Sequence, residues 1–196
     1  MSATIGFVDK RATLRNFNGN MSAWLRSLSL VALAFLLACN HIADYDLWYH
    51  LRTGERISEE GIPQIDDYSF MSAGQPYVDV HWLFQWGSAA IFHAGGTTGL
   101  VIAKASIASC VVAVALLAVR GLASFWTLSV ATLLMSCRFY ERPEILTLLF
   151  TAVYLAVMIH ATYKPKLLLF LPIVQVVWAN VQGLYVTPGL IDVHVH

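Results

Sequence analysis

Long apolar runs separated by short polar segments dominate the chain. A first run reaches from about Ser22 to Asn40, and four more follow the mixed, polar stretch 41–98. These four are Gly99–Val119, Leu122–Ser136, Ile145–Ala161 and Leu167–Asn180. Because about 20 apolar residues cross a bilayer as a helix, the pattern predicts an all-α polytopic membrane protein with about five transmembrane helices.

The polar stretch begins with a predicted short helix. The Asp46 carboxylate can accept bonds from the free backbone N–H groups at a helix start, so we expect it to cap a helix that runs to Glu60. Gly61 and Pro63 then end this helix.

A second short helix is expected over Val80–Ala94. Asp79 can cap it, and Gly95-Gly96 close it. The segment is short for a span and its tryptophans suit an interface, so we expect it to lie on the membrane. The first outer loop, 41–98, therefore holds two interfacial helices.

The basic residues predict the orientation in the membrane. With the N-terminus in the cytoplasm, the cytoplasmic segments collect Lys10, Arg11, Arg15, Arg120, Lys164 and Lys166. This agrees with the positive-inside bias. Counting Val80–Ala94 as a span would invert everything after it and move the lysine pair outside, so five spans is the better interpretation.

The N-terminal segment has two interpretations. Residues 1–21 are polar and lack an apolar period, which predicts a loose cytoplasmic tail before an uncleaved anchor. A signal peptide is the alternative, since Leu36-Leu37-Ala38-Cys39 resembles a lipoprotein cleavage site. The uncleaved anchor is preferred because the later apolar runs already require membrane integration.

Composition supports the membrane assignment and excludes other classes. The chain is 58% hydrophobic and 12% charged, whereas soluble domains carry about 25% charged residues. Lys and Arg number 12, as do Asp and Glu, so the charge gives no argument for a nucleic-acid partner. Cys39, Cys110 and Cys137 are an odd number without C-x-x-C spacing, which indicates neither a disulfide framework nor a zinc site.

An acid pair follows the first apolar run directly. Asp44 and Asp46 avoid the hydrocarbon and should lie at the aqueous surface. This placement suits an enzyme with a lipid-linked donor, although the same residues could simply end a helix. Asp46 and His50 are i,i+4 neighbours on the predicted helix, so they could bind a divalent cation or provide a general base.

The second candidate segment connects the third and fourth predicted spans. Arg138 and Arg142 could hold phosphate oxygens, because arginine offers a planar fork of donors. Anchoring at lipid headgroups explains the same arginines without a ligand.

Four stretches carry a resemblance to a known family. They are Asp44-Tyr-Asp-Leu-Trp-Tyr-His-Leu-Arg-Thr-Gly-Glu55, Pro76-Tyr-Val-Asp-Val-His-Trp-Leu-Phe-Gln85, Arg138-x-x-x-Arg-Pro-Glu144 and Trp178-Ala-Asn-Val-Gln-Gly183. Together they resemble a bacterial membrane family related to the GT-C glycosyltransferases. That group includes protein O-mannosyltransferases, lipid A aminoarabinose transferases and oligosaccharyltransferase catalytic subunits.

The resemblance implies a polyprenyl-phosphate-sugar donor and a bacterial inner-membrane location. It implies that an acid of the first outer loop, Asp44 or Asp46, is the catalytic base, sometimes with a divalent metal. Of the two we favour Asp44, because Asp46 is the expected helix cap. Substrate-binding residues are then expected at His50, Arg52, Arg138, Arg142 and Glu144.

Complete GT-C enzymes have about twice as many spans as this sequence predicts. We therefore expect residues 22–183 to form the N-terminal portion of an incomplete GT-C-like fold that is inactive alone. A non-catalytic multi-pass protein or transporter fragment is the alternative, although the inverted repeats and broken helices typical of transporters are not evident in the sequence.

The last residues carry a separate resemblance. Tyr185-Val-Thr-Pro-Gly-Leu-Ile-Asp-Val-His-Val-His196 resembles the first metal-binding strand of the amidohydrolase superfamily, which implies His194 and His196 as ligands. Two ligands make no closed metal site. We interpret 184–196 as a fusion or truncation scar, with a truncated amidohydrolase fusion as a further alternative.

Overall fold

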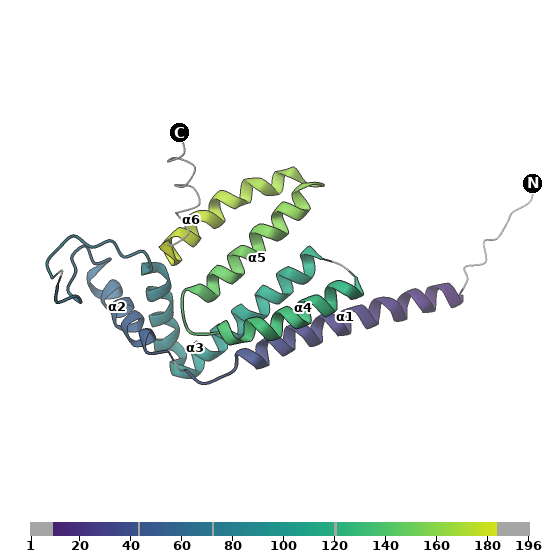
Figure 1. The fold of residues 1–196 in the computed structure, drawn as a ribbon, viewed down its shortest axis with the longest axis horizontal. Coiled ribbons are helices and arrows are strands. Elements are labelled where there is room, and N and C mark those ends of the chain that lie inside the picture. The colour runs from purple at the N-terminus through teal and green to yellow at the C-terminus, as the bar shows by residue number, and fades with distance from the viewer. Residues whose placement is uncertain (1–9, 43, 72, 120, 184–196) are drawn as a thin grey trace, which may run out of the picture.

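The computed structural model describes residues 10–183 except 43, 72 and 120. Six α-helices and two 3₁₀ helices follow one another (Figure 1): α1 Lys10–Ala38, α2 Asp46–Glu60, α3 Trp82–Ala118, α4 Leu122–Met135, η1 Ser136–Arg138, α5 Glu144–Ala161, η2 Pro165–Phe170 and α6 Leu171–Val181. In this described part the extended pairing is one isolated bridge between Ile65 and Pro76. The predicted all-α architecture is confirmed.

Three of the described helices are long and apolar enough to cross a membrane. They are α1 from Met21 onward, α3 and α5. The other two apolar segments of the predicted five are shorter, since α4 has 14 residues and α6 has 11. At 1.5 Å per residue, 14 residues extend about 21 Å, less than the ~30 Å of a hydrocarbon core.

Helix α1 begins earlier than the sequence predicts. Its backbone is helical from Lys10, so the stretch 10–21 continues the membrane helix where we expected a loose tail. The residues before it lie outside the described part.

Helix α3 combines two predicted helices. The expected break at Gly95-Gly96 is present as a kink at Gly96, whose backbone has φ 59° and ψ −151°. Glycine adopts this positive φ readily because it lacks Cβ. The expectation of two helices divided at Gly95-Gly96 is confirmed, and the second helix follows directly after the non-helical Gly96. The segment before Gly96 packs on α2, and the rest runs beside α1 (Figure 1).

Helix α2 packs closely against the first half of α3. A Cβ placed on Gly54 would lie 2.1 Å from the Gln85 carbonyl oxygen, so glycine is required where the two backbones touch. Small side chains serve the same purpose deeper in the bundle, where Ala38, Ala105 and Ala108 are fully buried. Close approach of backbones through small residues is how membrane helices gain van der Waals contact.

The predicted bounds of α2 are confirmed, but its predicted cap is wrong. The helix runs from Asp46 to Glu60 and ends at Gly61, which has φ 89°. The carboxylate at its start belongs to Asp44, whose Oδ1 accepts a bond from the Asp46 N–H at 3.1 Å. An Asp side chain that binds the N–H two residues on forms an Asx-turn, and this turn leads into α2.

Asp79 makes the corresponding local bond before α3. Its Oδ1 accepts from the His81 N–H at 3.0 Å, and the helix itself begins at Trp82. The predicted cap is therefore wrong, because Asp79 forms an Asx-turn before α3 and the helix start carries no side-chain cap bond.

Candidate functional site

The two candidate segments of the sequence meet in space. Arg142 donates through Nε and Nη2 to the two carboxylate oxygens of Asp44, with 3.0 Å between Nη2 and Oδ1. The same Nη2 lies 3.1 Å from Asp46 Oδ2. One guanidinium therefore holds both members of the acid pair, as its fork of N–H donors permits.

The two carboxylates differ in their surroundings. The Asp44 side chain is 3% exposed, whereas that of Asp46 is 64% exposed. The bond from Arg142 is the main reason that the pKa of Asp44 lies below its ordinary value; burial opposes this effect and the Asp46 N–H adds to it. Asp44 is thus a buried carboxylate that binds Arg142 and the backbone N–H of Asp46. The Asp46 carboxylate is exposed to solvent.

The arginines line an open cavity of about 640 Å³. Its lining residues come mainly from the η1–α5 connection and the first turn of α5: Asp44, Arg138, Tyr140, Arg142, Glu144, Thr147 and Leu148. The structure thus brings Arg138, Arg142 and Glu144 together with Asp44, as predicted for a substrate site. The lining combines two guanidinium groups with the carboxylates of Asp44 and Glu144, so the cavity offers arginine donors to an anionic group without a net positive charge.

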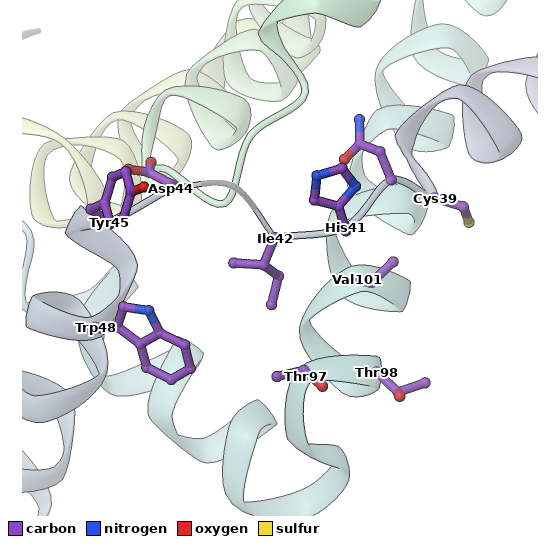
Figure 2. A pocket seen from close by; sticks show the side chains of 10 residues that line it. Cys39, His41, Ile42, Asp44, Tyr45, Trp48, Thr97, Thr98 and Val101 are labelled. Atoms are coloured by element: carbon purple, nitrogen blue, oxygen red, sulfur yellow. The ribbon is translucent and has the colours of Figure 1, made fainter.

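A second cavity of about 610 Å³ is lined by the end of α1, the α1–α2 connection and the start of α2 (Figure 2). His41, Ile42, Tyr45 and Trp48 belong to its lining, and α3 contributes Thr97, Thr98 and Val101 just after its kink. Asp44 lines this cavity as well as the first. Asp44 therefore lies between an arginine-lined cavity and a cavity with aromatic side chains in its lining.

His50 lies behind the acid pair in the α2–α3 interface. It is 8% exposed, its ring centroid is 5.3 Å from that of Phe84 and 6.0 Å from that of His81. Within the described residues its Nδ1 has no hydrogen-bond partner. Burial, helped by His81, lowers the pKa of His50 to about 4. His50 is therefore a neutral, buried ring at physiological pH.

Arg52 lies apart from the other candidate substrate-binding residues. Its side chain is exposed and forms an ion pair of 3.2 Å with Glu55 on the same helix. Within the described part of the chain, it is not among the residues that line either cavity. A role for Arg52 in substrate binding stays a prediction from the resemblance.

The metal candidates do not assemble into a ligand set in the described residues. Across that part of the chain, no group of three or more His, Cys, Asp or Glu side chains is arranged to hold a metal ion. Asp46 and His50 differ strongly in exposure, and His194 and His196 lie outside the described residues.

The sequence did not identify a buried ion pair beside this site. Lys104 Nζ lies 2.5 Å from Glu141 Oε1, and their side chains are 2% and 4% exposed. The lysine also donates to Asn40. Lysine inside an apolar run signals a need for a partner, and we expected either an aqueous face or such a partner. Glu141, which directly precedes Arg142, is that partner.

The remaining resemblance stretches also contact each other. Trp82 Nε1 donates to Asn180 Oδ1 at 2.7 Å, and a Cβ on Gly183 would lie 2.5 Å from Val80 Cβ. The segments around Pro76–Gln85 and Trp178–Gly183 are therefore packed together. The start of α3 and the end of α6 are thus in contact, although Trp82 and Asn180 lie 98 positions apart in the sequence.

These features define a membrane protein with a charged site at one end of its apolar helices. Comparison with protein families, with curated proteins and with solved structures finds no match.

Proposed function

We propose that this chain is the N-terminal portion of a membrane glycosyltransferase that uses a polyprenyl-phosphate-linked sugar. The supporting observation is the ion-pair cluster of Arg142 with Asp44 and Asp46, which joins residues 98 positions apart at an arginine-lined cavity. Such a transfer requires a base and a positive charge that can hold phosphate, both close to the lipid.

The geometry reverses our preference between the two acids. Asp46 is assigned the role of general base, because its carboxylate is exposed and carries one bond from Arg142. Asp44 is assigned a positioning role, because its buried carboxylate holds Arg142 and the start of α2. The lowered pKa of Asp44 also makes its carboxylate a weaker base, which disfavours Asp44 for proton removal.

The reaction follows from these roles. Asp46 takes the proton of an acceptor hydroxyl, whose oxygen forms a bond to the anomeric carbon. The bond from that carbon to the phosphate oxygen breaks, and polyprenyl phosphate leaves with the electron pair. Arg138 and Arg142 stabilise the charge on the leaving phosphate, while the nearby carboxylates favour the oxocarbenium-like transition state.

The arginines provide the direct test. In the full-length protein reconstituted with farnesyl-phosphate-linked hexoses, Arg138→Gln is expected to raise the KM for the donor about 10–100-fold, since a hydrogen bond to a charged group contributes about 1.5–3 kcal/mol. Arg56→Gln is the matched control, because Arg56 pairs with Glu60 and Asp67 at the far end of α2.

An unchanged KM in Arg138→Gln would contradict the phosphate-binding role. Absence of transfer from every such donor, in a wild-type protein that is folded and inserted, would refute the proposed function and favour a non-catalytic membrane component.

For the topology we propose five spans in a bacterial inner membrane, with the N-terminus in the cytoplasm and 41–98 outside. α4 and α6 would then cross a thinned bilayer or extend with their flanking 3₁₀ turns. The basis is the distribution of basic residues together with the apolar character of these helices.

Labelling of single cysteines in a cysteine-free variant tests this topology. A thiol at the exposed Ala73 is expected to react with a membrane-impermeant maleimide from outside, and a thiol at the exposed Lys166 only after the cytoplasmic side is opened. Labelling of position 73 from the cytoplasmic side alone would overturn the orientation.

A further inference from the structure

Lys104 is a buried charge in the middle of an apolar helix. Its ammonium group donates to Glu141 Oε1 at 2.5 Å, to Asn40 Oδ1 at 2.5 Å and to the Asn40 carbonyl oxygen at 3.3 Å. An ammonium group has three donors, so these three contacts account for its full hydrogen-bonding capacity.

The three contacts connect the two segments that form the candidate site. Asn40 follows the end of α1 and begins the connection that carries Asp44 and Asp46. Glu141 directly precedes Arg142 in the η1–α5 connection. A single side chain from α3 therefore holds both segments, one on each side of the Asp44–Arg142 ion pair.

Stability alone is a poor explanation for this arrangement. Removing two charges from water is costly, and a well-packed hydrophobic pair in place of a buried ion pair is often equally stable or more so. What the ion pair provides beyond an apolar contact is a defined position for two irregular segments.

We propose that Lys104 is a positioning residue, which keeps the segment of Asp44 and Asp46 in register with the segment of Arg138 and Arg142. This inference rests on the proposed function as far as catalysis is concerned. The register itself is a structural property that can be measured without any substrate. A misplacement of 1 Å can reduce a rate 10²-fold, so a fixed register matters for the transfer step.

Native cysteines provide probes on both segments. Cys39 adjoins Asn40 and Cys137 adjoins Arg138, and both side chains are exposed. In the protein with Cys110→Ala, spin labels at these two positions report the separation of the segments through their dipolar coupling.

The decisive variant removes both charges. Lys104→Met/Glu141→Leu leaves no uncompensated charge, so its Tm is expected to stay near the wild-type value, whereas Lys104→Met alone leaves Glu141 buried without its partner and lowers the Tm. If Lys104 positions the two segments, the double variant shows a broadened label separation and a kcat reduced about 100-fold despite its normal Tm.

Val112→Ala is the matched control. Val112 is buried on α3 against Leu30 and Ala34, away from both segments. This variant is expected to lose stability through the cavity it creates, while its label separation stays as in the wild type. Broadening in Val112→Ala equal to that in the double variant would overturn the inference.

The remaining outcomes separate this inference from the proposed function. A wild-type label separation in the double variant overturns the positioning role whatever the transfer assay shows. A broadened separation with wild-type kcat overturns it too, because the register would then be irrelevant to transfer. A broadened separation, in a protein whose wild type transfers no sugar, supports the register and refutes the glycosyltransferase proposal.

Discussion

Asp46→Asn in the full-length protein is expected to reduce sugar transfer about 10²–10⁴-fold, the usual contribution of a general base. Asparagine keeps the shape of the side chain but cannot take a proton at neutral pH. Asp46 is exposed and does not cap α2, so expression, insertion and Tm should remain near wild type. Initial rates with a polyprenyl-phosphate sugar, beside thermal unfolding, measure both effects.

Asp44→Asn is expected to lose transfer and stability together. Asparagine can still accept the Asp46 N–H, since it is a good residue at helix starts, but it loses the ion pair with Arg142. Glu59→Gln, at an exposed position of α2, is the control for removal of a negative charge. Near-normal transfer in both aspartate variants would show that the acid pair is structural and that the proposed mechanism is wrong.

The fold class and several element boundaries could be predicted from local pattern. Apolar runs and their breakers predicted an all-α chain, the bounds of α2 from Asp46 to Glu60, and a break at Gly95-Gly96. These features depend on residues that are adjacent in sequence. The direct continuation of the chain into a second helix after Gly96 could not be predicted, because a glycine at positive φ can be followed by a loop or by another helix.

The residues of the site could be predicted from the sequence, but the ion pairs between them could not. Two acids spaced two residues apart, Asp44 and Asp46, are equivalent as patterns. Which of them is buried depends on Arg142, which is distant along the chain. The local pattern therefore assigned the helix cap to Asp46 and catalysis to Asp44, whereas in the structure the side-chain bond before α2 is made by Asp44.

Lys104 illustrates the same limit. Its place in an apolar run predicted a partner or an aqueous face, because a charge in a membrane helix needs one or the other. The identity of that partner is a tertiary fact, set by the packing of α3 against α1 and α5. The number of transmembrane helices is harder still to predict from the sequence, because the lengths of α4 and α6 depend on where the connecting turns begin.

Acidification is expected to weaken the packing of α2 on α3 through His50. The pKa of His50 is lowered to about 4 by burial first and by His81 second, while Asp46 and Asp44 act in the opposite direction and Arg142 in the same direction. The unfolded histidine has a pKa near 6.5, so between pH 6.5 and 4 the unfolded segment binds a proton that the folded one does not.

The sign follows from linkage. The stability that neutral His50 supports is complete above pH 6.5 and decreases as the pH falls from 6.5 to 4, by about 3 kcal/mol at most. Asp79 acts oppositely, because burial raises its pKa, and its contribution is lost as the pH rises from 3.8 through its folded pKa. Asp44 has a lowered pKa, so its contribution to stability is complete above about pH 3.8 and is lost only as the pH falls below that value.

Hydrogen exchange of the α2 amides, corrected for the intrinsic effect of pH, measures this local stability. Between pH 6.5 and 4.5 the wild type is expected to lose protection, and His50→Phe, which keeps a ring against Phe84, is expected to lose much less. The comparison is made in an Asp79→Asn background, which removes the opposing titration, and His93→Phe on the exposed side of α3 is the matched control. Equal losses of protection in His50→Phe and the wild type would show that His50 does not cause the pH dependence.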